Sequence, residues 1–133
     1  SLVGSAALKR ELAAAGAKGI KPAYLGVLLV LWSQDGLKVV ELGRRVGLEP
    51  STMTGLLDRM ERDGLVQRRA DPEDRRAQRI HLTDEGRAAS EPVNGVIDRA
   101  LTTMFEGIEE RAIEGLKQTL RRVLQNAHRL GQP

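Results

Sequence analysis

Residues 36–69, GLKVVELGRRVGLEPSTMTGLLDRMERDGLVQRR, constrain the fold more than any other part of the sequence. Proline is favoured at the first turn of a helix, and glycine just after its last. Pro50 therefore predicts a helix start and Gly64 a helix end, so that one helix spans about 50–63. A shorter helix at about 39–46 precedes it, and a tight turn at Leu48-Glu49 joins the two helices. Two helices joined in this way predict a helix-turn-helix motif.

The helix at 50–63 is predicted to have two unlike faces, because successive residues turn by about 100° around a helix. One arc is apolar and faces the core: Met53, Leu56, Leu57 and Met60. The opposite arc is small and polar at its start and cationic further along: Ser51, Thr54, Gly55, Asp58 and Arg62, flanked by Thr52 and Arg59. In helix-turn-helix proteins, such a face reaches base edges in the major groove. An ordinary amphipathic surface helix would show the same two faces.

A β-hairpin is predicted directly after this helix. Residues 65–70 and 78–82 favour strands, and the alternation in the second strand turns Ile80 and Leu82 toward the core and Arg79 and His81 outward. The intervening Asp-Pro-Glu-Asp has the composition of a turn. A strand pair in this position predicts the wing of a winged helix.

Arg75 and Arg76 fall at the tip of the predicted hairpin. An arginine beside a recognition helix can enter the adjacent minor groove, where the negative potential attracts it. Asp74 is well placed to orient one of the two by a bidentate pair. The alternative is a solvated tip whose charges only keep the protein in solution.

The rest of the chain is predicted to be helical. Residues 5–16 and 22–34 favour two helices, and the second is apolar nearly all round, which predicts burial on most sides. Thr83 is expected to cap a helical region over 83–130, interrupted at Gly107. Its apolar stripes exceed what the small domain can cover, so a second subunit is the simplest partner. An intramolecular bundle is the alternative.

Composition narrows the class of protein. The 133 residues fit one compact domain, and aromatic residues make up 2%, so the core must be aliphatic. The absence of cysteine excludes disulfides and thiolate metal sites. Without a membrane-spanning apolar run or a signal peptide, a cytoplasmic location is expected. The chain begins with Ser-Leu-Val, without methionine, which suggests processing or trimming. A formal net charge of +3 does not by itself indicate nucleic-acid binding.

The run VELGRRVGLEPSTMTGLLDRMERDGLVQRR, followed by DPEDRRAQRIHLTDEGR, closely resembles the MarR (multiple antibiotic resistance regulator) family of bacterial winged-helix transcription factors. The specific part spans about 36–87. The resemblance implies a mainly α fold with a small β-hairpin wing. It further implies N- and C-terminal dimerisation helices within 1–35 and 88–133, around a DNA-binding lobe at 36–87, all in one compact chain. The N-terminus looks short for the family's first helix.

The resemblance also implies a homodimer that represses transcription from a palindromic double-stranded operator and is released by a small phenolic or lipophilic ligand. In the family the arginine of the wing's Asp-x-Arg lies in the minor groove, which corresponds to Arg76 and Asp74. The base-reading positions correspond to Ser51, Thr52, Thr54 and Gly55, the last of which is often arginine in relatives. The full set of residues predicted to contact DNA is Lys38, Ser51, Thr52, Thr54, Gly55, Arg59, Arg62, Asp74, Arg75, Arg76 and Arg79.

Two other classes of function, a protein-binding module and an enzyme, fit the sequence less well. A winged helix could bind an acidic protein through Arg75 and Arg76, although the exposed face of the helix at 50–63 offers no apolar anchor. An enzyme is disfavoured because His81 and His128 lie in no evident cluster with a nucleophile, and two isolated histidines make a weak metal site. Neither a cofactor nor a metal is expected. Core packing is the simplest role for the only aromatic residues, Tyr24, Trp32 and Phe105.

Overall fold

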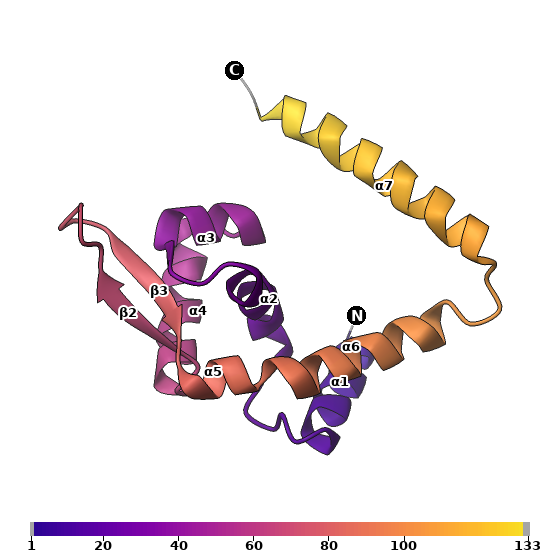
Figure 1. Cartoon of the computed structure of the whole chain (residues 1–133), viewed down its shortest axis with the longest axis horizontal. Helices are drawn as coiled ribbons and strands as arrows, with labels where there is room; N and C mark the ends of the chain where they lie inside the picture. The colour runs from indigo at the N-terminus through magenta and orange to yellow at the C-terminus, as the bar shows by residue number, and fades with distance from the viewer. Residues whose placement is uncertain (1, 132–133) are drawn as a thin grey trace. The chain divides into compact units, whose positions relative to one another are not determined.

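The computed structural model describes residues 2–131 of the chain (Figure 1). It divides the chain into two units, of which the first ends at Ile97 and the second begins at Asp98. The first unit holds the helix-turn-helix and a three-stranded sheet. The second holds the end of α6 and the whole of α7.

The elements follow one another in the order expected for a winged helix. Their bounds are α1 (Leu2–Ala14), the 3₁₀ helix η1 (Pro22–Tyr24), α2 (Leu25–Ser33), β1 (Leu37–Lys38), α3 (Val39–Val46), α4 (Pro50–Arg62), β2 (Val66–Ala70), β3 (Gln78–Leu82), α5 (Asp84–Ala88), α6 (Ser90–Met104) and α7 (Glu110–Leu130). The predicted bounds of α3 and β3 are confirmed to the residue, and those of α4 and β2 to within one. The first helix begins and ends earlier than predicted, and η1 opens the second.

Aliphatic side chains fill the core of the first unit, as the shortage of aromatic residues predicts. Leu28 and Leu31 of α2 lie in one buried cluster with Leu42 of α3, Leu57 of α4 and Ile80 of β3. The expectation that α2 is buried on most sides holds only in part. Val27, Leu28 and Leu31 are buried, whereas Leu29 is 44% exposed. Leu56 and the other three predicted apolar residues of α4 are buried as well.

Gly64 ends α4 as predicted. It has a φ of +78°, in the left-handed region where glycine avoids the steric cost of a side chain. The Gly64 N–H donates to the Glu61 carbonyl, and the Leu65 N–H donates to the Met60 carbonyl, each at 3.0 Å. These are the two bonds of a Schellman motif. Leu65 is buried beside it, so the chain turns from α4 directly into the wing.

The wing is part of a three-stranded antiparallel sheet, where a two-stranded hairpin was predicted. The strand order is β1-β3-β2, with Leu37 opposite Ile80 and Lys38 opposite Arg79. The prediction missed β1 because two residues are too short to show an alternating pattern. β1 leads directly into α3, so the base of the wing is hydrogen-bonded to the start of the helix-turn-helix.

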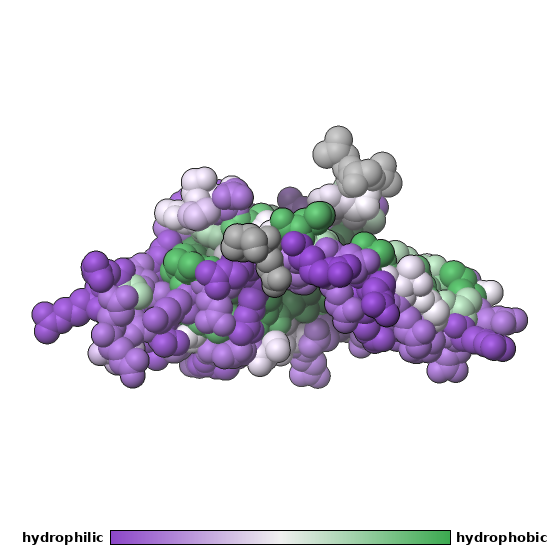
Figure 2. Space-filling model, turned by 90° about the horizontal axis from the view of Figure 1, so that it is seen from above, coloured by the Kyte–Doolittle hydropathy of each residue, from purple (hydrophilic) through white to green (hydrophobic). Residues whose placement is uncertain are grey.

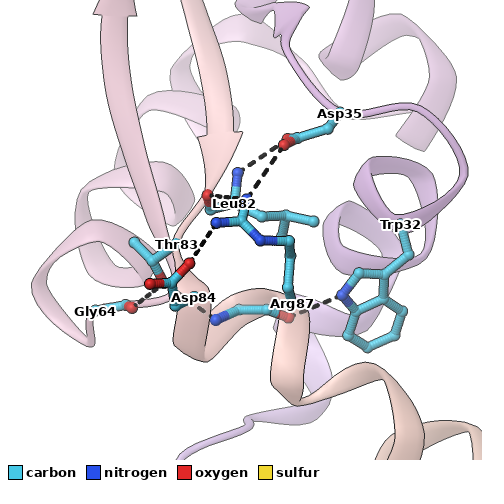
Figure 3. Close-up of polar contacts among 8 residues, drawn as sticks. Trp32, Asp35, Gly64, Leu82, Thr83, Asp84 and Arg87 are labelled. Carbon is cyan, nitrogen blue, oxygen red and sulfur yellow. Dashed lines mark hydrogen bonds and ion pairs between the residues drawn. The ribbon is translucent and has the colours of Figure 1, made fainter.

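The junction between the wing and α5 is held by a network around Thr83 (Figure 3). The Thr83 Oγ1 accepts from the Gly86 N–H at 3.0 Å, as predicted for a helix cap, and donates to the Gly64 carbonyl at 2.5 Å. The Trp32 indole N–H donates to the Gly86 carbonyl at 2.9 Å. Thr83 and Gly86 thereby connect α2, the end of α4 and α5.

Arg87 completes the same network. Its guanidinium donates to the Leu82 carbonyl at 3.0 Å and to Asp84 at 2.6 Å. Asp35, which lies 3.8 Å from Arg87, accepts from the Leu82 N–H at 2.9 Å. The carbonyl and the N–H of Leu82, at the end of β3, are therefore both held by side chains (Figure 3).

The region predicted to be helical over 83–130 forms three helices. Pro92 falls in the first turn of α6, where its missing N–H is not needed. Gly107, with a φ of +77°, lies in the break between α6 and α7 as predicted. None of the helices within residues 2–131 is long and apolar enough to cross a membrane.

Hydrophobic side chains reach the surface among hydrophilic ones (Figure 2). Within the second unit, none of the side chains of α7 is buried. Its apolar stripe is partly or largely exposed: Ile113, Leu116, Leu120, Val123, Leu124 and Ala127. A helix that carries such a stripe needs a partner surface to cover it.

Candidate nucleic-acid interface

The first two turns of α4 present small polar groups to solvent. Ser51, Thr52 and Thr54 are all exposed. The Thr54 hydroxyl donates to the Pro50 carbonyl at 3.0 Å, one turn back along the helix. Because its proton is used in this bond, Thr54 offers outward only the acceptor lone pairs of its oxygen and a methyl group. Those groups suit an amino group or a thymine methyl on a base edge.

Gly55 leaves an open space on the same face. A Cβ built at this position would meet only the Arg59 Nη1 atom, at 3.7 Å, which is ordinary van der Waals contact. The fold therefore does not require glycine here. A side chain at this position would project into open space beside Thr54.

The second half of α4 carries two arginines beside two acids, Asp58 and Glu61. Arg59 and Arg62 are exposed in its last turn, where positive charge also complements the helix dipole. Beyond them, the Tyr24 hydroxyl donates to the Asp63 carboxylate at 2.5 Å. Burial of Tyr24 and this bond to Asp63 raise the pKa of Tyr24 from 10.0 to about 12. The bond connects the C-terminal cap of α4 to η1. Tyr24 is fully buried, so its predicted role in core packing is confirmed.

The tip of the wing carries two exposed arginines, Arg75 and Arg76. The side chain of Arg76 is 97% exposed. The expected bidentate pair between Asp74 and an arginine is absent in the structure. Instead, Asp74 Oδ1 accepts from the backbone N–H of Arg76 at 3.0 Å, and its distance to the Arg76 Nε is 3.9 Å. Asp74 thus shapes the turn through the backbone and makes only a long ion pair with the Arg76 guanidinium, which stays exposed.

Lys38 lies close to the wing tip. A surface groove of about 490 Å³ is lined by Lys38 at the end of β1 and by Arg75 and Arg76. Pairing of β1 with β3 brings these cations together, although almost forty residues separate them in the sequence. The groove places three cations at the border of the wing, beside Asp74 and the start of α3.

Arg79 has a different environment from the arginines of the tip. Its Nε donates to Asp71 Oδ2 at 2.6 Å, and its Nη1 donates to the Gly36 carbonyl at 2.8 Å. Its side chain is 36% exposed. The prediction that Arg79 contacts DNA stays a prediction, but its guanidinium already joins the wing to the loop before β1.

Asp71 organises the turn of the wing, and the sequence reasoning gave it no role beyond turn chemistry. Its carboxylate has no exposed surface and accepts from the N–H groups of Glu73 and Asp74 as well as from Arg79. The bond from the Glu73 N–H, followed by those from Arg79 and Asp74, outweighs burial and lowers the pKa of Asp71. The sequence signal that could have indicated this role is an aspartate directly before a proline, with an arginine eight residues later.

The remaining candidates lie apart from this surface. His81 is half-buried on β3 against Gly36, and His128 is exposed on α7. Within residues 2–131, no group of three or more histidines, aspartates and glutamates is placed to hold a metal ion. Trp32 is half-buried on α2 with its N–H satisfied, and Phe105 is half-buried after α6.

Comparison with known proteins identifies the family. Residues 21–77 match the model of the MarR family. A solved MarR-family transcriptional regulator from Rhodococcus sp. RHA1 is 30% identical and superposes with a TM-score of 0.75, over 90% of this chain and 82% of that one. The chain belongs to the MarR family. The predicted winged-helix fold is thereby confirmed.

This chain spans only part of the length of the curated MarR-type relatives that it matches. The transcriptional regulator TtmR of Methylorubrum extorquens (strain PA1) is 52% identical over 66 residues, which is 50% of this chain and 33% of TtmR. The organic hydroperoxide resistance transcriptional regulator of Bacillus subtilis (strain 168) is 35% identical over 97 residues, 73% of this chain and 62% of that protein.

Two solved relatives are complexes. Reduced AbfR bound to DNA is 30% identical, with a TM-score of 0.64, over 92% of this chain and 84% of that one. CouR from Rhodococcus jostii RHA1 bound to p-coumaroyl-CoA is 28% identical, with a TM-score of 0.72, over 90% of this chain and 81% of that one.

Proposed function

We propose that this MarR-family chain is a sequence-specific transcriptional regulator that binds double-stranded DNA through α4 and the wing. The observation that carries the proposal is the polar surface of α4 from Ser51 to Arg62, with Arg59 and Arg62 exposed on it, beside a wing tip on which the Arg76 side chain is 97% exposed. Binding of DNA by the related AbfR supports it. Because such a regulator works on chromosomal DNA, we place it in the cytoplasm.

In this proposal, the small residues at the start of α4 read bases in the major groove. Ser51, Thr52 and Thr54 can approach base edges closely, and Gly55 leaves room for the duplex. Arg59 and Arg62 attract the phosphates, as do Lys38 and Arg75 at the border of the wing: these contacts position the protein without selecting a sequence.

Arg76 has a separate role in the proposal. Its side chain is 97% exposed and is carried by a turn that Asp71 and Asp74 hold through backbone N–H groups. A fixed turn with an exposed guanidinium suits insertion into the minor groove, where electrostatic potential is most negative in narrow A·T tracts. Arg79 supports the wing from its base and is the weaker candidate for a DNA contact.

We propose that the functional form is a homodimer in which a second copy covers the apolar stripe of α7. A two-fold dimer would present two copies of α4 to half-sites about 34–36 Å apart. The variant Leu120→Glu/Leu124→Glu should lower the molar mass measured by light scattering to that of one chain. Arg122→Glu changes the net charge by the same amount on the opposite face of α7, where Arg122 is exposed, and should leave the dimer intact. A monomeric parent protein would contradict the proposal.

We further propose that a small lipophilic or phenolic ligand releases the protein from a repressed operator. The structure of CouR with p-coumaroyl-CoA supports ligand control in a relative. Such a ligand must bind more tightly to the state in which the two copies of α4 are misplaced for DNA. No catalytic step is part of this proposal, and turnover of a substrate panel would argue against it.

The decisive experiment is selection from random duplex DNA, followed by titration of the enriched site at several salt concentrations. A palindromic site bound far more tightly than random duplex would support the proposal. Weak binding that is indifferent to sequence would reduce the interaction to phosphate attraction. The winged helix would then be better explained as a protein-binding module, and a partner pull-down would follow.

A further inference from the structure

Arg68 lies on the side of β2 that packs against α4. β2 is an edge strand, and its register places Arg68 opposite the fully buried Ile80, on the same face of the sheet. A charged side chain that points inward from an edge strand needs a partner, because burying an unpaired charge is costly. The side chain of Arg68 is only 19% exposed.

The partners of Arg68 are two carboxylates of α4. Its Nη2 donates to Asp58 Oδ1 at 2.6 Å, and its Nη1 donates to Glu61 Oε1 at 2.9 Å. The backbone N–H of Arg68 donates to the second oxygen of Glu61, Oε2, at 3.0 Å. One residue of the wing is thus bound to α4 through three bonds, at the two acidic positions of the helix.

These two acids lie where negative charge would oppose DNA binding. Asp58 and Glu61 keep 53% and 42% of their side chains exposed, so their charge reaches the surrounding solvent. Asp58 falls on the polar arc of α4, between Thr54 and Arg62 in the turn of the helix. An uncompensated carboxylate there would repel the phosphates that Arg59 and Arg62 attract.

We propose that Arg68 is a positioning residue of the DNA interface, which neutralises Asp58 and Glu61 and fixes the wing against α4. The inference rests on the proposed DNA-binding function and deepens it. Arg68 acts through the two acids and not by touching DNA, since both of its terminal nitrogens are engaged and its side chain is largely covered. In this it differs from Arg76, whose side chain is 97% exposed and lies 3.9 Å from its one paired carboxylate, Asp74, among the described residues.

The test is a cycle of variants that measures the effect of Arg68→Gln in two backgrounds. The first is the parent protein, and the second carries Asp58→Asn and Glu61→Gln. The probe is the duplex enriched by selection, titrated at several salt concentrations. Arg69→Gln removes the same charge from the neighbouring residue of β2, which is exposed. It therefore measures the effect of charge loss alone.

We expect Arg68→Gln to weaken binding about tenfold in the parent protein, because it leaves two carboxylates unpaired beside the phosphates. In the neutralised background the same substitution should change affinity less than about twofold, the range for independent sites. Arg69→Gln should weaken binding less than Arg68→Gln. Arg68→Lys, which keeps the charge without the planar fork, should fall between Arg68→Gln and the parent protein.

Equal losses from Arg68→Gln in both backgrounds would overturn the proposal and indicate a direct contact between Arg68 and DNA. Equal losses from Arg68→Gln and Arg69→Gln would also overturn it, in favour of general charge attraction. If Arg68→Gln does not fold in the parent protein, the comparison within the neutralised background still tests the proposal. No carboxylate is left there to neutralise, so a large loss of affinity from Arg68→Gln in that background would overturn it. If the parent protein binds no duplex, the proposed DNA-binding function is wrong. That result can be told apart from a failure of the Arg68 proposal alone, in which the parent protein still binds DNA.

Discussion

Substitution of Gly86 by alanine tests the close packing between α5 and the end of α4. A Cβ at this position would lie 2.1 Å from the Leu65 carbonyl oxygen, 3.1 Å from the Leu65 carbonyl carbon and 3.2 Å from the Leu82 Cδ2. The first contact is with backbone and is too short for any rotamer change to relieve. α5 would have to move away from Leu65.

The cost of this movement can be estimated from its parts. Overpacking a well-packed core costs about 1–3 kcal/mol. The displaced Gly86 would also weaken the bond from the Trp32 indole to its carbonyl, at about 0.5–1.5 kcal/mol for one hydrogen bond. We therefore expect Gly86→Ala to lower the free energy of unfolding by about 3 kcal/mol.

The assay is equilibrium unfolding in denaturant at one fixed protein concentration, because dimerisation would make stability depend on concentration. Fluorescence of Trp32, the only tryptophan, reports directly on this junction. Gly115→Ala in α7 is the matched control: a Cβ there meets nothing within 4 Å, so the change should be neutral or stabilising by about 0.5–1 kcal/mol. If Gly86→Ala is no more destabilising than this control, the packing argument is wrong.

Three other outcomes follow from the charged groups. Arg76→Ala should weaken DNA binding by a factor of ten or so and leave the melting temperature unchanged, because the side chain is 97% exposed; a fall of many degrees would make it structural. Ultraviolet titration of Tyr24, the only tyrosine, should show a midpoint near pH 12, and Asp63→Asn should lower that midpoint. Because folding raises the pKa of Tyr24, the stability that its proton contributes is complete below pH 10.0. That stability is lost as pH rises through 12. Asp71 has a lowered pKa, so its stabilisation is present above its ordinary pKa of 3.8 and is lost as pH falls through the folded value. Acid unfolding of Asp71→Asn should therefore show a shallower dependence on pH than that of the parent protein, and equal slopes would refute this.

The sequence by itself determined most elements of the winged helix and their order, although it did not show the two-residue strand β1 or the division between α5 and α6. Pro50 and Gly64 mark the ends of α4 through local backbone preferences, and Thr83 marks the start of α5 through its side-chain cap. The inward and outward faces of α4 follow from helical periodicity. These features depend on residues within one or two turns of each other, which is why they can be predicted without knowledge of the fold.

The tertiary structure decided which charged residues are free to contact a partner. Arg68, Arg75, Arg76 and Arg79 look alike in the sequence, yet Arg68 is bound to two acids of α4 and Arg79 to the buried Asp71. The pairing of Leu37 with Ile80 likewise brings Lys38 to the wing. Each of these outcomes depends on contacts between segments that pack together only in the folded chain. Local propensity carries no information about such contacts, because the energy of a charge is set by the groups that surround it.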